Sequence, residues 1–237
     1  MSYFIFLFFV LISSQTLFAQ TQKVDSLENV LKGYSSENPE KVDIMNEIAY
    51  SIFTSDAQKA MKYASEAAQL ADRLKYSKGK AVSLWGTGLT YTKKDIQASI
   101  KYLQQSLAIA ETLKDQTVLC NCLIAIGNVQ KELGNIPRSD ESYERAVKIA
   151  NGIEDKSYLL KCLVNIAQNY TAKGEYVKSI DALEKSIQLA EELKDNLMLA
   201  KSLNSLASVY STQSNHSVAL EYYFKALKIN EQLGNQS

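Results

Sequence analysis

Residue types that mark catalytic and metal-binding proteins are scarce in this sequence. Its 237 residues include one His and three Cys, which leaves little material for a metal site and argues against a metalloenzyme. Lys plus Arg and Asp plus Glu each number 26, so the formal net charge is zero, and the basic excess typical of nucleic-acid binders is absent. Hydrophobic residues make up 46% of the chain, more than an intrinsically disordered protein carries.

Residues that break helices are also rare. The chain has two Pro and nine Gly, while Ala, Leu, Ser, Lys and Glu are abundant. Because Gly and Pro are the two poorest helix formers, their scarcity favours long helices. Composition therefore indicates a protein made of α-helices.

The start of the sequence differs from the rest of the chain. Residues 2–20 contain no Asp, Glu, Lys or Arg, and Tyr3 to Ile12 form a continuous apolar run. This run is shorter than the roughly 20 residues that cross a bilayer as a helix, and it is typical of a secretory signal peptide. We expect a signal peptide over residues 1–19, cleaved after Ala19, with an uncleaved anchor as the alternative. No other long apolar run follows, so the mature chain is predicted to lack a membrane span and to be exported, to a bacterial periplasm.

The three cysteines do not suggest a disulfide framework. Cys120 and Cys122 are two positions apart, which places them on nearly opposite faces of a helix. They therefore cannot form a conventional disulfide or share a metal ion. We expect three small, partly buried thiols. The separation between Cys122 and Cys162 is the period of a wider pattern in the chain.

Small residues recur at a nearly constant interval over most of the chain. Five segments align, and each carries a small residue followed by another seven positions later. Most of the segments open with Asp or Asn, which favour helix N-caps. The pattern predicts five copies of one helix. The paired small residues are Ala60 and Ala67, Ser99 and Ser106, Ser139 and Ala146, Ser179 and Ser186, and Ala219 and Ala226.

A second helix precedes each of these copies. Its apolar residue is followed four positions later by a small one, which is the spacing of one helix face. Small residues at fixed positions let neighbouring helices approach to about 8–10 Å. Stacked helix pairs then bury a core that one pair cannot bury alone. The apolar and small residues are Met45 and Ala49, Leu84 and Gly88, Leu123 and Gly127, Leu163 and Ala167, and Leu203 and Ala207.

These motifs resemble the tetratricopeptide repeat family. The stretches that match best are residues 123–129, 163–170 and 203–210 in the first helix, with 178–186 and 218–226 in the second. The resemblance covers about residues 41–234. The period of about 40 exceeds the family's usual length of about 34, and the family's terminal proline is missing. The long repeats are more loosely similar to exported input regions of bacterial sensor kinases and regulators. The resemblance implies an all-α, right-handed α-solenoid of five helix-turn-helix repeats.

Two further segments flank this array. Residues 20–38 are predicted to form a capping helix and linker, and Asn38 and Pro39 form a helix-start signal. The solenoid is expected over residues 39–237, with repeats at about 39–76, 77–115, 116–155, 156–195 and 196–234. No polar capping helix follows the last repeat, although such arrays normally need one. The uncapped end favours self-association, cover by a partner, or a continuation of the chain.

The family binds proteins or peptides on the concave face lined by the first helix of each repeat, and the resemblance implies a similar groove here. Trp85 has two interpretations, as a groove residue or as a core residue. The asparagines are suited to bonding a peptide backbone, and the lysines to meeting an acidic partner. The expected groove residues are Tyr50, Trp85, Leu89, Ile124, Asn128, Lys131, Lys161, Val164, Asn165, Gln168, Lys201 and Asn204.

No catalytic motif accompanies these repeats. The single histidine, His216, falls in a predicted surface turn, and no phosphate-binding loop or zinc-protease motif is present. We therefore predict a non-enzymatic protein-binding or peptide-binding scaffold without a cofactor. The alternative is the extracytoplasmic sensory input region of a longer signalling protein.

Overall fold

The computed structural model of the protein describes residues 22–235. Within that range the regular secondary structure is helical, and the helices follow one another in helix-turn-helix order, as in an all-α solenoid. The chain divides after Asn135 into two compact units. We call residues 22–135 the N-terminal unit and residues 136–235 the C-terminal unit. The expected signal peptide, residues 1–19, lies outside the described residues.

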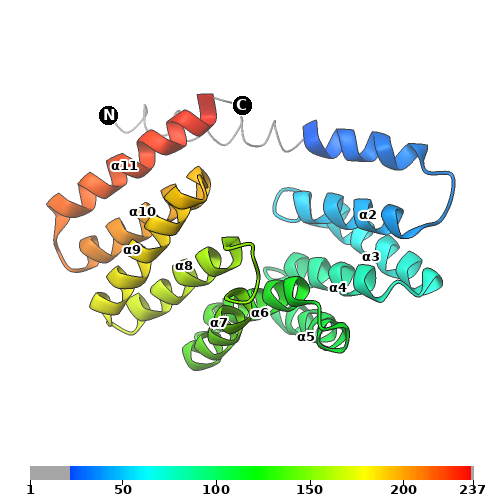
Figure 1. Cartoon of the computed structure of the whole chain (residues 1–237), viewed down its shortest axis with the longest axis horizontal. Coiled ribbons are helices and arrows are strands. Elements are labelled where there is room, and N and C mark those ends of the chain that lie inside the picture. Colours follow the sequence, from blue (N-terminus) through cyan, green and yellow to red (C-terminus); the bar gives the residue numbers. More distant parts are fainter. Residues whose placement is uncertain (1–21, 236–237) are drawn as a thin grey trace. The chain divides into compact units, whose positions relative to one another are not determined.

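The N-terminal unit starts with a helix at residues 22–33. Each of the labelled helices after it packs against the next one along the chain. The even-numbered helices also contact each other, α2 with α4 and α4 with α6. Figure 1 shows this succession from blue to green. The helices are α2 (Pro39–Ile52), α3 (Ala57–Leu74), α4 (Ser77–Tyr91), α5 (Ile96–Leu113) and α6 (Gln116–Glu132).

The C-terminal unit continues the alternation. Here too each helix packs on its successor, and α8 contacts α10. The last helix, α11, is the longest of the unit and is drawn in red in Figure 1. The helices are α7 (Ile136–Ala150), α8 (Ser157–Ala172), α9 (Tyr176–Glu192), α10 (Asn196–Thr212) and α11 (His216–Asn235).

Side-chain caps determine where several of these helices begin. The Asn38 side chain accepts a hydrogen bond of 2.9 Å from the backbone N–H of Lys41, and Pro39 occupies the first turn of α2. This arrangement satisfies a backbone donor that the helix itself leaves unpaired. Aspartates cap four other helices in the same way: Asp56, Asp95, Asp115 and Asp195.

The turns after α6, α8 and α10 share a left-handed residue. Gly134, Gly174 and Ser214 have φ angles of 73°, 76° and 61°, and they occupy the same position in successive repeats. Each of them donates its backbone N–H to the carbonyl three positions earlier. A side chain is strained in this conformation because its Cβ crowds the backbone, so glycine is favoured there. Ser214 adopts this left-handed conformation although it has a Cβ, so its backbone is strained.

The small residues of the sequence pattern lie in the packing between helices. All ten small positions of the odd-numbered helices are buried, at 0–3% exposure. Gly88 on α4 illustrates why size matters there, because a Cβ on it would lie 2.7 Å from the Leu103 Cγ of α5. Two of the buried serines also bond across the helix pair. Ser99 Oγ donates to the Gly88 carbonyl at 2.7 Å, and Ser179 Oγ donates to the Ala167 carbonyl at 2.8 Å.

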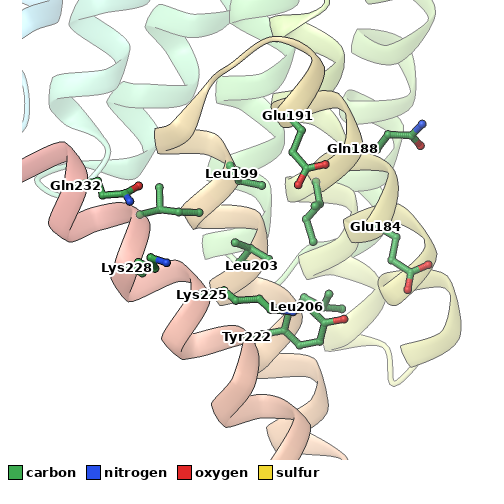
Figure 2. A pocket seen from close by; sticks show the side chains of 12 residues that line it. Glu184, Gln188, Glu191, Leu199, Leu203, Leu206, Tyr222, Lys225, Lys228 and Gln232 are labelled. Carbon is green, nitrogen blue, oxygen red and sulfur yellow. The ribbon is translucent and has the colours of Figure 1, made fainter.

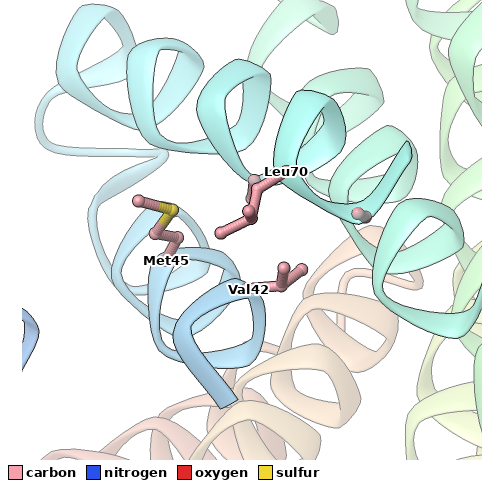
Figure 3. Close-up of a cluster of buried hydrophobic side chains, with 5 residues drawn as sticks. Val42, Met45 and Leu70 are labelled. Carbon is pink, nitrogen blue, oxygen red and sulfur yellow. The ribbon is translucent and has the colours of Figure 1, made fainter. Parts of the chain in front are cut away.

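The first helix pair has its own apolar core. Figure 3 shows Val42 and Met45 of α2 beside Leu70 of α3, and all three are buried. The helix at residues 22–33 covers this pair, with Val24 packed at 4% exposure into a neighbouring cluster. Tyr63 Oη on α3 donates to a Glu28 carboxylate oxygen at 2.8 Å. The N-terminal helix is therefore held by both apolar and polar contacts.

Candidate functional site

A short stack of aromatic rings connects α2 with α4. The ring centroids of Tyr50 and Phe53 are 5.6 Å apart, and those of Tyr50 and Trp85 are 5.0 Å apart. Tyr50 is 46% exposed, so the stack reaches the surface of the N-terminal unit. Stacked aromatic rings offer a large, rigid contact area for a ligand.

Trp85 combines the two roles that the sequence left open. It is half-buried and packs against core clusters that include Val118 and Ala125 of α6. It also stacks on the exposed ring of Tyr50. Its indole Nε1 is buried and has no hydrogen-bond partner among the described residues. Trp85 thus joins the core of the unit to its surface.

A cavity of about 360 Å³ adjoins the aromatic stack. It lies at the C-terminal ends of α2, α4 and α6, and Phe53 belongs both to its lining and to the stack. Leu89 and Val129 give it apolar surface, while Asn128 and Lys131 give it polar groups. Three of the expected groove residues, Leu89, Asn128 and Lys131, therefore line one cavity.

Several positions in one row of expected groove residues are buried instead of facing solvent. Each even-numbered helix contributes one residue to this row, three positions before its small residue. The row consists of Asn46, Trp85, Ile124, Val164 and Asn204. Asn46, in this row, donates from Nδ2 to the Gly79 carbonyl of α4 at 3.0 Å and accepts from Ser83 Oγ at 2.7 Å. Ile124 and Val164 are 9% and 0% exposed. Val164 is therefore a core residue, because α8 packs against α10.

The remaining expected residues of the C-terminal unit differ in exposure. Asn165 is buried at 7%, whereas Lys161 and Gln168 of α8 are half-buried. Lys201 and Asn204 of α10 are exposed. Although Lys201 as a whole residue is exposed, nearby protein atoms partly desolvate its ammonium group, and this desolvation, followed by repulsion from Lys161, lowers its pKa. Asn204 occupies the same row as Val164 but is exposed on the last even-numbered helix.

A larger cavity, of about 610 Å³, lies in the C-terminal unit and was not expected from the sequence. Figure 2 shows Glu184 and Glu191 on its α9 side and Lys225 and Lys228 on its α11 side. Leucines of α10, including Leu203, lie between them. Acidic residues on one odd-numbered helix and lysines on the next are the sequence signal that could have revealed it.

The thiols and the acidic groups do not assemble into a reactive centre in the part of the chain that the structure describes. Cys120, Cys122 and Cys162 are buried, and none of them forms a disulfide. Across residues 22–235, no group of three or more His, Cys, Asp or Glu side chains is placed to hold a metal ion. None of the helices in this range is long and apolar enough to cross a bilayer.

Two family models match parts of the sequence. Residues 158–232 match a tetratricopeptide repeat model. Residues 89–169 match a model described as anaphase-promoting complex subunit 5. No curated protein sequence matches the chain significantly.

Solved structures with a similar fold include three helical-repeat proteins. A Rap protein complexed with competence and sporulation factor has a TM-score of 0.72 and 16% identity, and the match covers 97% of this chain and 75% of that one. BtubC from P. vanneervenii has a TM-score of 0.68 and 13% identity, with 94% and 92% covered. NprR, in complex with its cognate peptide NprX, has a TM-score of 0.65 and 20% identity, with 92% and 63% covered.

The family model and the shared fold agree with the period of the sequence and with the buried small residues. Residues 158–232 match the tetratricopeptide repeat family, and the described chain shares its fold with the Rap protein structure.

Proposed function

We propose that the protein is a non-catalytic scaffold that binds a peptide, or an extended segment of a protein, at the cavity beside the aromatic stack. This proposal rests on one observation: Phe53 stacks on the exposed ring of Tyr50 and also lines the cavity at the ends of α2, α4 and α6. Binding sites typically combine apolar walls with a few placed polar groups, and this cavity has both.

The lining indicates what kind of peptide fits. Leu89, Ala125 and Val129 suit one apolar side chain. Asn128 carries both a donor and an acceptor, which matches a peptide backbone. Lys93 and Lys131 outnumber the one acid of the lining, Glu132, and favour an acidic residue next to the apolar one. The Rap structure, complexed with competence and sporulation factor, and the NprR structure, in complex with its cognate peptide, support a ligand of this class.

Trp85 offers a built-in reporter of binding, because it is the only tryptophan of the chain and stacks on exposed Tyr50. A library of short peptides that pair Leu, Ile or Phe with Asp or Glu is titrated while the indole fluorescence is recorded. We expect acidic-apolar peptides to change the emission with saturation. Basic peptides of the same length serve as the comparison and should not saturate.

Charge reversals then locate the site. Lys131→Glu should weaken binding of an acidic peptide about tenfold, because attraction becomes repulsion in a partly desolvated cavity. Lys148→Glu on α7, an exposed lysine of the other unit, is the matched control and should bind normally. Glu191→Lys tests the cavity between α9 and α11. Loss of binding in Glu191→Lys with normal binding in Lys131→Glu would refute the proposed site.

A second candidate function is a peptide-responsive input region of a longer protein. The observation that favours it is that this chain covers 63% of NprR, whose structure contains a bound peptide. Dyes attached to exposed residues in each unit, such as Lys62 and Lys185 changed to Cys, report on the two units together. A peptide that changes energy transfer between them supports a sensory role, whereas binding without any change supports a static scaffold.

We also propose that the protein is exported after cleavage behind Ala19. The support is the uncharged apolar start of the sequence. Intact mass and fractionation of the protein from its own cells test it. The expected result is a species found outside the cytoplasm and lighter than 26.5 kDa by the mass of residues 1–19. Full-length protein in the cytoplasm would contradict export.

A further inference from the structure

Helix α11 has two apolar faces, and only one of them is packed in the C-terminal unit. Ala219 and Ala226 are buried against the rest of the unit. Leu220, Tyr223, Phe224 and Leu227 follow the spacing of a single helix face and are 55%, 39%, 65% and 40% exposed. We call these four residues the outer stripe of α11. A helix that is apolar on both faces is normally covered on both.

Three positions of the outer stripe are contact positions in the preceding repeats. The counterparts of Leu220, Tyr223 and Leu227 on α9 are Ile180, Leu183 and Ile187, which pack with Leu206 and Val209 of α10. The same holds on α5, where Ile100 and Leu103 pack with residues of α6. The outer stripe therefore has the form of a helix-binding face.

The fourth position distinguishes α11 from the other odd-numbered helices. The counterparts of Phe224 are Glu184, Glu144, Gln104 and Ser65, all of them polar. Phe224 is 65% exposed, so its ring contributes little to the packing of its own repeat. An added aromatic ring at this position widens the apolar face beyond what the internal repeats use to bind the next helix.

The apolar residues of the outer stripe are placed symmetrically about its centre. Counting outwards from the Tyr223–Phe224 bond, Leu220 and Leu227 occupy matching positions on the two sides. One helical turn beyond them stand His216 on one side and Glu231 on the other, along the same helix face. A two-fold axis through the centre of the stripe would bring the two leucines together and place His216 opposite Glu231 of a second copy.

Two residues of opposite charge lie beside the stripe. Glu221 and Lys228 lie on one flank, on either side of the centre, and both are exposed. In an antiparallel pair of helices, residues of the same flank meet, so Glu221 of one copy approaches Lys228 of the other, twice per dimer. A parallel two-fold pair would instead place this flank of the two helices on opposite sides of the interface, so Glu221 and Lys228 would form no pair between the copies. Charge complementarity therefore selects the antiparallel arrangement.

Glu221 already has a partner within its own helix. Lys225 Nζ lies 2.7 Å from a Glu221 carboxylate oxygen, and both side chains are more than half exposed. An exposed ion pair of this kind contributes little energy. Glu221 can therefore turn towards Lys228 of a second copy at small cost.

We propose that the outer stripe of α11 binds the outer stripe of a second copy of this chain, antiparallel about a two-fold axis near the Tyr223–Phe224 bond. Such an interface is isologous, with the same patch contributed by both copies. The aromatic rings of Tyr223 and Phe224 form its centre, and the pairs of Glu221 with Lys228 flank it. The proposal does not depend on the peptide site of the other unit.

Sedimentation velocity of the full chain over a wide concentration range tests the dimer. We expect a monomer–dimer equilibrium, and Phe224→Glu should raise the dissociation constant at least about tenfold, because central aromatic residues dominate such interfaces. Leu197→Glu on α10 is the matched control, since Leu197 is 66% exposed and lies outside the stripe. It should leave the dissociation constant unchanged. Circular dichroism confirms that each variant is folded.

A charge swap tests the orientation. Glu221→Lys alone and Lys228→Glu alone should each weaken the dimer about tenfold, because each creates two like-charge pairs. The double variant Glu221→Lys with Lys228→Glu should recover most of the affinity, since every pair is again opposite in sign. A double variant as weak as the single ones would overturn the antiparallel pairing.

Two further results would overturn the proposal. A dimer that persists in Phe224→Glu is held together by another surface. A chain that stays monomeric at every concentration would assign the outer stripe to a different protein or to a following segment, and would exclude the second copy as its occupant.

Discussion

The hydroxyl of Ser179 on α9 donates a hydrogen bond of 2.8 Å to the backbone carbonyl of Ala167 on α8. Ser99 makes the equivalent bond to Gly88 in the N-terminal unit. In the first and last repeats the same position is Ala60 or Ala219, and both are buried. The position thus requires a small side chain. Where that side chain is serine, its hydroxyl adds a hydrogen bond between the two helices.

Removing that hydroxyl should cost little compared with enlarging the residue. We expect Ser179→Ala to lower the free energy of unfolding by about 1 kcal/mol, the usual contribution of one buried hydrogen bond. Ser179→Leu should cost about 1–3 kcal/mol or more, because the added atoms have no space between the helices. Urea denaturation followed by circular dichroism measures both. Equal effects of the two substitutions would contradict the primary role of size.

The contact between Gly88 and Leu103 predicts a coupled pair. A Cβ at Gly88 would lie 2.7 Å from Leu103 Cγ and 2.8 Å from its Cδ2, so Gly88→Ala should destabilise by about 1–3 kcal/mol. Leu103→Ala should also destabilise, by leaving a cavity. In the first repeat the corresponding pair is Ala49 with Ala64, which shows that two alanines are compatible with this fold. The double variant should therefore be less destabilised than the sum of the single variants, as a double-mutant cycle measures.

The strained turn at Ser214 predicts a stabilising substitution. Its φ of 61° matches the angles of Gly134 and Gly174 at the equivalent turns. Ser214→Gly should raise the free energy of unfolding by roughly 1 kcal/mol, because the left-handed conformation costs a side chain about that much. Gly174→Ser is the reciprocal control and should destabilise by a similar amount. A melting temperature unchanged in both variants would show that these turns carry no strain.

The buried thiols should be unreactive while the protein is folded. Burial raises the pKa of Cys120 to about 11 and that of Cys122 to about 12. Because the thiolate is the reactive form, almost none is present at pH 8. We expect no labelling of Cys120 and Cys122 by a thiol reagent in buffer, and rapid labelling in urea, as mass spectrometry detects. Rapid labelling of the native protein would show that α6 opens readily.

The periodic features of the fold were predictable because each is repeated. Five copies of a small residue at Ala60 and its equivalents predict buried helix contacts, and the structure buries every one of them. The helix order and the all-α class follow from the same repetition. The sequence pattern of a single helix pair is weak, but five aligned copies of it make the pattern recognisable.

The candidate site was only partly predictable. Leu89, Asn128 and Lys131 line one cavity, whereas Val164 is buried. Sequence spacing gives the face of a helix, but a small rotation of that helix decides whether a residue faces solvent or the neighbouring helix. The cavity between α9 and α11 was missed because it depends on the space between two helices, which no single-helix pattern encodes.

The limited contacts of α11 have a consequence for how this protein can change. Within the described C-terminal unit, α10 is the one helix whose backbone packs closely along α11. Loss of α11 would expose one face of α10 but leave the packing among α7, α8, α9 and α10 in place, because stability in such arrays is the sum of nearest-neighbour interfaces. Exchange of α11 is therefore a change that this architecture tolerates, and it would leave the cavity at α2, α4 and α6 untouched.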